Sequence, residues 1–399
     1  MKINRLLMHK VNWVIITALL VILLNIYQNN VLNKKPFRWT QEATQSDWKV
    51  SSPEREGFNP SELIKLHKNV ERNSAKKVQS MLIARNGKLV FERYYLNRSS
   101  SDGTPMPDPY PPAPDTFHHM KSVTKTVTAT LIGSLLYQKA IPSIDTPLFD
   151  YYLEDDVPNL DSKRNILIKH ALDFNSGLDW SEWNERNSDA MNMWLSDDPY
   201  RYIFEKDVLH TPGEKYVYQG AMSVLLGGLV ERVTGKELRT YTSEVLFAPL
   251  NIVNYHWFPH EVTGDFLGSS GLYLRSRDFA KLGQLYLNKG LWNGQRVFSE
   301  QWAEECLVPK GQFWKDRTIQ YGHNWWFPLI KVGDEKILIA AMRGAGGQDM
   351  FIIPELQLIF LITSGNYQQQ DEHYPLDLIA DYVLPSLNIT HAKHYPFAL

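Results

Sequence analysis

The sequence contains almost no cysteine, and its histidines form no recognisable metal-binding motif. Cys306 is the single cysteine among 399 residues, so no intrachain disulfide can form and no site with several thiolate ligands can be built. The segment HEVTGD begins at His260 like a zinc-protease motif, but Gly264 stands where the second histidine would be. His118 and His119 are adjacent, so on an extended segment they point to opposite sides. We therefore expect no bound metal, and we expect Cys306 to be a core or surface thiol.

An excess of charge of either sign is also missing. The 42 Lys and Arg residues nearly balance the 44 Asp and Glu residues, which gives a formal net charge of -2 and a pI near 6.6. Nucleic acid is therefore not an expected partner, because proteins that bind it carry a basic surface. The chain also has no Walker A and no G-x-S-x-G sequence, which disfavours a nucleotide-binding enzyme and an α/β-hydrolase.

Charge is absent altogether from one N-terminal stretch. No charged residue lies between Lys10 and Lys34, and the segment from Trp13 to Tyr27 is almost wholly apolar. A helix of this length can cross a hydrocarbon core of ~30 Å. A cleaved signal peptide is the competing interpretation, but the segment is followed by no small-residue cleavage site. We predict a cytoplasmic stub and single-pass membrane anchor over residues 1–32, with the catalytic part outside the cytoplasm.

The remainder of the sequence predicts an α+β architecture. Residues 33–53 lack periodicity and are interpreted as a tether, and residues 54–399 form the predicted catalytic domain. The expected fold is an antiparallel sheet built from N- and C-terminal strands and flanked by helices, with a mostly helical second lobe over roughly 122–290 inserted between the sheet halves. The segments that carry this prediction are a capped helix that begins at Asn59 or Ser61, a hairpin over 79–96 around Asn86-Gly87, strands over 336–342, 350–354 and 356–363, and a closing helix over 375–387.

One predicted helix begins with a serine and a lysine three residues apart. In SVTKTVTATLIGSLL, an apolar stripe follows Ser122 and Lys125, and residues i and i+3 of a helix lie on neighbouring faces. Two interpretations are open. Ser122 could cap the helix while Lys125 faces solvent, or Ser122 could be a nucleophile activated by a lysine of lowered pKa.

Several further segments, in the same order along the chain, resemble a known family. The sequence YQGAMSVLLGG places Tyr218 before a second helix, and RGAGGQ begins at Arg343 between two late strands. Together with LDFNSGLDW and YGHNWW, they resemble the serine β-lactamase-like superfamily of penicillin-recognising enzymes, in its branch related to class C β-lactamases. The likeness extends from about Gly57 to the C-terminus. It implies the β-lactamase/transpeptidase-like fold.

The resemblance also implies roles for individual residues. Ser122 would be the nucleophile of the S-x-x-K motif and Lys125 its proton acceptor or electrostatic partner. Tyr218 resembles the tyrosine of the Y-x-N motif, which relays protons to the leaving group and to the deacylating water. The backbone N–H of Ser122, with that of Ala345 or Gly346, would form the oxyanion hole.

Two departures from the family pattern affect the expected substrate. Gly220 stands where the Y-x-N motif has its asparagine, and Arg343 stands where lactamases carry lysine. Arg343, Gly347 and Gln348 are the candidate substrate-binding residues. For Arg343 two alternatives are open, namely binding of a substrate carboxylate and a structural ion pair.

The function expected from the resemblance is hydrolysis of an ester or amide through an acyl-enzyme on Ser122, with no metal or organic cofactor. The expected partners are a small-molecule or peptide acyl substrate and the membrane. One alternative is a D-alanyl peptidase or β-lactamase acting on peptidoglycan-type peptides or β-lactams. Another is a binding or scaffold protein of the same fold with little activity. Trp180, Trp183 and Trp194, in the aromatic segment 177–207, either line a substrate groove or pack in the core.

Overall fold

The computed structural model describes residues 38–40, 48–95, 113–183, 187–314, 319–332, 335–367 and 373–387. The chain divides into residues 1–39 and 40–399, and every element below belongs to the second unit. The predicted anchor over 1–32 lies outside the described residues. Within the described ranges, no helix combines the length and the hydrophobicity that a membrane crossing requires.

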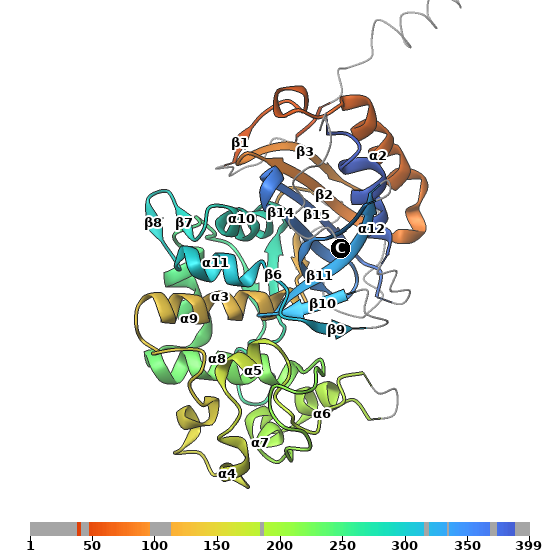
Figure 1. Ribbon diagram of the computed structural model, residues 1–399. Helices are drawn as coiled ribbons and strands as arrows, with labels where there is room; N and C mark the ends of the chain where they lie inside the picture. The colour runs from red at the N-terminus through yellow and green to blue at the C-terminus, as the bar shows by residue number, and fades with distance from the viewer. Residues whose placement is uncertain are drawn as a thin grey trace, which may run out of the picture. The chain divides into compact units, whose positions relative to one another are not determined.

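A ten-stranded sheet organises the fold (Figure 1). The strands of the N- and C-terminal parts meet where β2 pairs with β15, which sets Ile83 opposite Phe360. This confirms the predicted joining of the two ends of the chain in one sheet. The strand order is β1-β3-β2-β15-β14-β13-β11-β10-β9, with β12 paired to β11. The strands are β1 (Lys49–Val50), β2 (Val78–Arg85), β3 (Lys88–Tyr94), β9 (Gln312–Trp314), β10 (Ile319–Gly322), β11 (Trp325–Val332), β12 (Glu335–Leu338), β13 (Ala340–Gly344), β14 (Gln348–Ile353) and β15 (Leu358–Ser364).

The sheet is mixed, so the prediction of a purely antiparallel sheet is wrong at one edge. β1 runs parallel to β3, with Lys49 opposite Lys88, whereas the other pairings of this sheet are antiparallel. A parallel pairing needs a long connection, and the chain between β1 and β3 supplies it through a helix and β2. Trp48 is buried and donates from Nε1 to the Arg277 carbonyl at 3.0 Å. The end of the segment interpreted as a tether is therefore part of the folded unit.

The hairpin between β2 and β3 forms at the predicted turn. Arg85 pairs with Lys88, which leaves Asn86 and Gly87 as a two-residue loop with φ angles of 52° and 72°. Positive φ at both positions is the geometry of a type I′ turn, and Asn-Gly is its preferred sequence because these residues tolerate the left-handed region.

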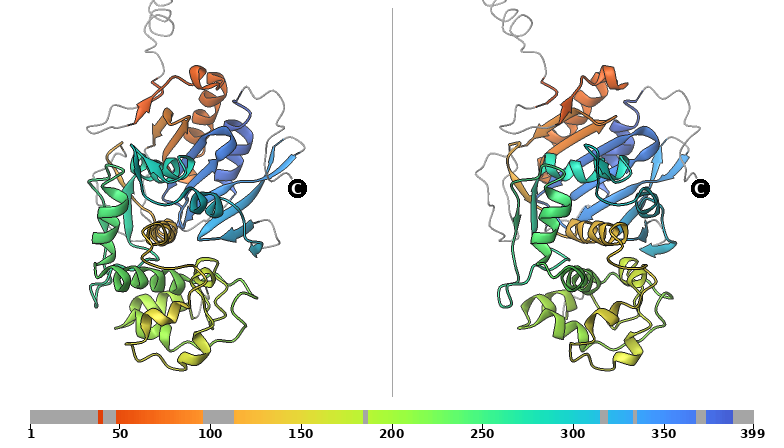
Figure 2. Two further views of the ribbon diagram at one scale, coloured as in Figure 1. Left: turned by 60° about the vertical axis from the view of Figure 1, so that its left-hand side comes forward. Right: turned by 90° about the vertical axis from the view of Figure 1, so that its left-hand side faces the viewer.

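Helices cover both faces of the sheet. Helix α10 (Ser276–Leu287) packs against β2, β14 and β15. The terminal helices α2 (Pro60–Arg72), α12 (Tyr374–Leu378) and η7 (Ile379–Val383) lie together on the other face (Figures 1 and 2). β14 and β15 are consequently buried along their whole length. This arrangement confirms the predicted covering of the sheet by the two terminal helices.

The middle of the chain is mostly helical and contains the candidate site. Helices α3 (Val123–Tyr137) and α8 (Gly220–Thr234) pack against each other. Residues 123–135 of α3 are all buried, so this helix is enclosed on every side rather than along one apolar stripe. The remaining elements are η2 (Glu54–Glu56), η3 (Ser74–Lys76), β4 (Phe117–His119), η4 (Leu148–Tyr152), α4 (Leu160–Lys163), α5 (Ile168–Leu172), α6 (Asp189–Leu195), α7 (Pro199–Phe204), α9 (Leu238–Thr242), η5 (Ser243–Phe247), β5 (His256–Trp257), β6 (Leu272–Arg275), β7 (Leu291–Trp292), β8 (Gln295–Arg296), α11 (Glu300–Cys306) and η6 (Pro354–Leu356).

A buried ion pair ties α10 to the sheet. Arg277 donates from Nε and Nη2 to the two carboxylate oxygens of Glu92 on β3, at 2.7 and 2.6 Å. The side chains are 6% and 0% exposed, and the Tyr94 hydroxyl adds a hydrogen bond to Oε1 at 2.6 Å. A buried charge is tolerated only while its partner remains. The pair therefore fixes how α10 sits on the sheet.

We expect the variant Arg277→Met to lose about 3–5 kcal/mol of unfolding free energy, because it leaves the Glu92 carboxylate buried without its cation. Urea denaturation of the purified protein measures this loss. The matched control is Lys65→Met, which removes the cation of the exposed Lys65–Glu62 pair and should cost less than about 1 kcal/mol. Equal effects of the two substitutions would contradict the prediction.

Candidate active site

Ser122 and Lys125 interact directly at the start of α3. Lys125 Nζ donates to Ser122 Oγ at 2.9 Å and to the Ser269 carbonyl at 3.0 Å, and Lys125 is 4% exposed. Ser122 occupies the N-cap position, but its side chain accepts no hydrogen bond from the backbone of the helix. The interpretation as a capping serine with a solvent-facing lysine is therefore wrong. The two side chains instead form a hydroxyl–amine pair in which the amine is buried and the hydroxyl is partly buried.

The surroundings of Lys125 favour its neutral form. Burial lowers the pKa of Lys125 from 10.5 to about 8, and the negative charge of Glu182 partly opposes this shift. Desolvation has this direction because a buried ammonium loses its hydration. An amine with a pKa near 8 is neutral in an appreciable fraction of molecules at neutral pH. It can therefore accept a proton from a hydroxyl in contact with it.

Tyr218 is the third member of the cluster. It precedes α8, its hydroxyl is hydrogen-bonded to Ser122, and Lys125 Nζ lies 5.3 Å from the centre of its ring. Burial and the charge of Glu182 raise the pKa of Tyr218, while the hydrogen bond with Ser122 opposes them. The phenol therefore stays protonated, and it can pass a proton on through its hydroxyl. The structure brings together the three residues that the resemblance assigns to catalysis.

Aromatic rings hold Tyr218 in this position. Its ring stacks with Trp183, with 4.6 Å between centroids and 18° between planes, and with Trp326 at 5.4 Å and 28°. Phe174 meets it edge-on at 5.0 Å. Trp183 is 61% exposed, whereas Trp180 is buried. Of the two alternatives for the tryptophans, core packing applies to Trp180, and Trp183 presents an apolar surface beside the cluster.

The turn after β13 lies close to the residues that precede Ser122. A Cβ at Gly344 would stand 2.3 Å from the Met120 carbonyl oxygen, so only a glycine allows this approach. The Gly346 carbonyl accepts a hydrogen bond from the Asn366 N–H at 3.0 Å, and Gly346 has a φ of +86°. The structure thus places the Ala345-Gly346 turn near the start of α3. The oxyanion-hole role of these two residues and of the Ser122 N–H remains a prediction.

The three candidate substrate-binding residues lie on β13, on β14 and in the turn between these two strands. Arg343 Nε donates to Asp349 Oδ1 at 2.7 Å across β13 and β14. The structure therefore shows the ion-pair alternative for Arg343. Gln348 is buried and donates from Nε2 to the Ser364 carbonyl at 2.5 Å. Gly347 has a φ of +86°, and a Cβ there would stand 3.0 Å from the Ser364 Cβ.

Glu182 is a residue of this site that the sequence analysis did not identify. Its Oε2 accepts hydrogen bonds from the Gly220 N–H at 2.7 Å and from Trp180 Nε1 at 2.6 Å. Glu182 is 8% exposed. No sequence motif links residues 182 and 220. The one indication in the sequence was the glycine at position 220, whose missing side chain leaves space for a side chain from another segment.

Cys306 and the adjacent histidines lie apart from this chemistry. Cys306 is fully buried, and burial raises the pKa of its thiol. Of the two expected positions, core and surface, the structure shows the core. His118 is buried and hydrogen-bonded to Gln79 at 3.0 Å, and His119 stacks on Tyr273 with 4.4 Å between centroids.

We expect the rate at which a fluorophosphonate labels Ser122 to rise with pH and to reach half its maximum near pH 8. The pKa of Lys125 is lowered to about 8, so the ammonium form that cannot accept the serine proton predominates below that pH. Intact-mass spectrometry over a series of pH values measures this rate. In Lys125→Met the rate should fall by a factor of about 10² or more. A half-maximum near the ordinary lysine pKa of 10.5 would contradict the prediction.

Comparisons with known proteins identify the family of the chain. The family model described as Beta-lactamase matches residues 69–384. The chain is 23% identical to the 6-aminohexanoate-dimer hydrolase of Paenarthrobacter ureafaciens over 66% of this chain and 69% of that one. It is 22% identical to a putative D-alanyl-D-alanine carboxypeptidase of Escherichia coli, over 51% of this chain and about half (49%) of that one. A solved structure, a putative 6-aminohexanoate-dimer hydrolase from Bacillus anthracis, has the same fold with a TM-score of 0.68 at 20% identity, covering 86% of this chain and 89% of that one. The chain therefore belongs to the beta-lactamase family and is a serine hydrolase.

Proposed function

We propose that this protein hydrolyses an ester or a small amide through an acyl-enzyme formed on Ser122. The observation that carries the proposal is the partly buried hydrogen bond of 2.9 Å between Lys125 Nζ and Ser122 Oγ, with the Tyr218 hydroxyl hydrogen-bonded to the same serine. A serine hydroxyl is a weak nucleophile until a base removes its proton. Here the base is in contact with it, and burial brings the pKa of that base into the working range.

The proposed reaction has two half-reactions. In the first, neutral Lys125 takes the proton from Ser122 Oγ as the oxygen attacks the carbonyl carbon of the substrate. The negative charge on the carbonyl oxygen is received by backbone N–H groups of Ser122 and of Ala345 or Gly346. The tetrahedral intermediate collapses as the leaving group departs with a proton that passes from Lys125 through the Tyr218 hydroxyl. In the second, water attacks the carbonyl carbon of the acyl-enzyme and gives up a proton along the same path. The bond to Ser122 Oγ breaks, the acid product leaves, and the serine hydroxyl is restored.

Two observations favour an ester or a small amide over a peptidoglycan-type peptide or a β-lactam. Position 220 is a glycine and offers no side-chain amide to a substrate. Arg343, which could have received a substrate carboxylate, already donates to Asp349. The similarity to a 6-aminohexanoate-dimer hydrolase also supports an amide substrate. The similarity to a putative D-alanyl-D-alanine carboxypeptidase supports the alternative, a D-alanyl peptidase.

A binding or scaffold protein of the same fold is the other alternative. Such a protein needs no buried lysine, because removing an ammonium from water costs free energy that its neighbours must offset. Lys125 lies at such a position and contacts a hydroxyl that can react. This arrangement favours an enzyme.

The first test is intact-mass analysis of the folded protein after brief exposure to an activated ester, a fluorophosphonate and a penicillin. We expect an adduct on the wild type from the ester and the fluorophosphonate, and none on Ser122→Ala. The control Ser143→Ala removes a serine remote from the cluster and should react like the wild type. An adduct from penicillin alone would favour the β-lactam alternative. A folded wild type that none of the three compounds modifies would leave the scaffold alternative in the lead.

We also propose that residues 1–32 anchor the protein in a membrane with residues 54–399 outside the cytoplasm. The support is the uncharged, apolar stretch between Lys10 and Lys34, which is long enough to span a bilayer as a helix. The full-length chain should remain in the membrane fraction after an alkaline carbonate wash, and a fragment from Lys35 should not. Protease added to cells with a permeabilised outer barrier should digest the domain. Release of the full-length chain by the wash, or protection from the protease, would refute this topology.

A further inference from the structure

We propose that Glu182 is a positioning residue, which holds a fixed negative charge beside Ser122, Lys125 and Tyr218 in the space that a side chain at position 220 would occupy. The inference rests on the proposed function and adds a residue that acts on the members of its proton path without carrying the proton. It has three supports, which are the fit of the carboxylate against Gly220, the anchoring of the segment that carries it, and its effect on the charges of the cluster.

The fit against Gly220 is close. A Cβ at position 220 would stand 2.9 Å from Glu182 Oε1 and 3.2 Å from Oε2, so any larger residue would press on the carboxylate. The Gly220 N–H donates to Oε2 at 2.7 Å, and Trp180 Nε1 donates to the same oxygen at 2.6 Å. Because Gly220 is two residues from Tyr218, these bonds hold the carboxylate next to the catalytic cluster.

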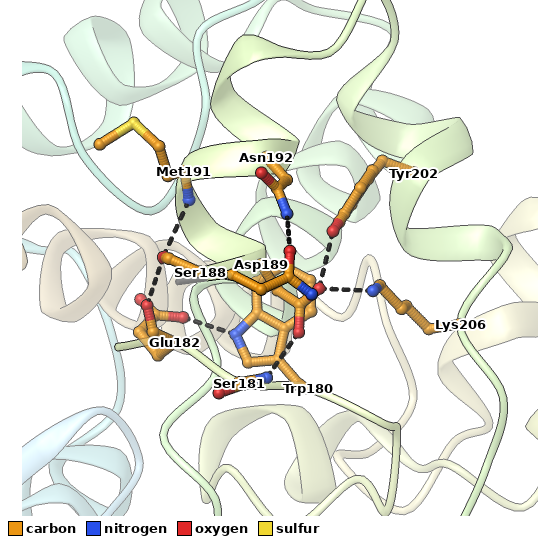
Figure 3. A network of polar contacts seen from close by, with 10 residues as sticks. Trp180, Ser181, Glu182, Ser188, Asp189, Met191, Asn192, Tyr202 and Lys206 are labelled. Carbon is orange, nitrogen blue, oxygen red and sulfur yellow. Dashed lines mark hydrogen bonds and ion pairs between the residues drawn. The ribbon is translucent and has the colours of Figure 1, made fainter. Parts of the chain in front are cut away.

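The segment that carries Glu182 is anchored by a second carboxylate (Figure 3). The Ser188 hydroxyl donates to the Glu182 carbonyl at 2.6 Å and accepts a hydrogen bond from the Met191 N–H at 3.2 Å. Asp189 is buried and accepts three hydrogen bonds that join this segment to α7 and to the chain that follows it. Its donors are the Ser181 N–H at 2.6 Å, the Tyr202 hydroxyl at 2.7 Å and Lys206 Nζ at 2.5 Å.

The charge of Glu182 acts on both partners of Ser122. It raises the pKa of Lys125 against the effect of burial, and it adds to the rise in the pKa of Tyr218. Among the described residues, Glu182 is the charged group that acts on Lys125. Tyr216, two residues before Tyr218, and Tyr321, on β10, are the neighbouring tyrosines. Burial raises the pKa of both, so they stay uncharged.

This arrangement has a consequence for the reaction. When the Ser122 proton moves to Lys125, a positive charge forms on a side chain that is only 4% exposed. A negative charge already fixed in the protein stabilises that ammonium without any rearrangement, and electrostatic effects of this kind are large in a buried site. Burial, together with the same charge, keeps the Tyr218 phenol protonated, so that it can donate its proton to the leaving group.

The variant Glu182→Gln tests the charge by itself. Both hydrogen bonds to the carboxylate end on Oε2, so a glutamine with its carbonyl oxygen at that place keeps both of them. Without the negative charge the pKa of Lys125 falls. We expect the acidic limb of the pH–rate profile, for fluorophosphonate labelling and for ester hydrolysis, to move to lower pH by about 0.5 unit or more, with a lower maximal rate.

Two further variants separate charge from structure. Glu182→Asp keeps the charge, and its acidic limb should stay near that of the wild type even where the maximal rate falls. Asp189→Asn disturbs the same segment without removing the charge beside Lys125. Its activity and stability should fall while the position of the limb is unchanged. A thermal unfolding midpoint for each variant shows whether it is folded.

An acidic limb that does not move in folded Glu182→Gln overturns the inference and leaves the proposed function intact. If instead the wild type shows no labelling that is lost in Ser122→Ala, the proposed function is overturned. If Glu182→Gln does not fold, the double variant Glu182→Ala with Gly220→Asn puts a neutral amide into the same space from the other side. The same downward shift is then expected, and an unchanged limb would again refute the role of the charge.

Discussion

The site depends on one contact, between the buried amine of Lys125 and the hydroxyl of Ser122. A lysine is rarely buried, because its ammonium is far better hydrated in water. Here α3 is enclosed along residues 123–135, and the chain at Ser269 passes close enough to accept a hydrogen bond from Nζ. Gly268 permits that approach, since a Cβ there would stand 2.3 Å from the Ser223 carbonyl of α8. The packing of α3 against α8 therefore also creates the chemistry at its N-terminus.

Charges near the site are balanced locally. Arg343 is paired with Asp349 at 2.7 Å. The negative charge of Glu182 acts on Lys125, and its carboxylate is held by two hydrogen bonds. Such compensation is needed because unpaired charges in a poorly hydrated region are costly. Burial and the charge of Glu182 also raise the pKa of Tyr218, so its phenol stays protonated.

Local patterns along the sequence correctly predicted several elements, and the family resemblance was confirmed. The Asn86-Gly87 hairpin and a helix starting at Asn59 or Ser61 could be predicted because their signals lie within a few residues, and of the two possible caps the structure shows Asn59. The parallel pairing of β1 with β3 was missed, because a two-residue strand has no periodicity of its own. The enclosure of α3 was missed as well, since its surroundings come from segments far away along the chain. For Arg343 the sequence left two alternatives; the pairing of β13 with β14 shows an ion pair with Asp349, and substrate binding by Arg343 stays a prediction.

The sequence by itself determined the spacing of Ser122 and Lys125, because helical geometry makes neighbours of residues three apart. It also determined that both ends of the chain contribute strands to one fold. Only the tertiary structure decided that Lys125 is buried, because burial depends on everything packed around α3. Burial in turn lowers the pKa of Lys125 to about 8. Likewise, Glu182 and Gly220 are 38 residues apart in the sequence. The Glu182 carboxylate therefore occupies the space beside Gly220 only once the chain has folded.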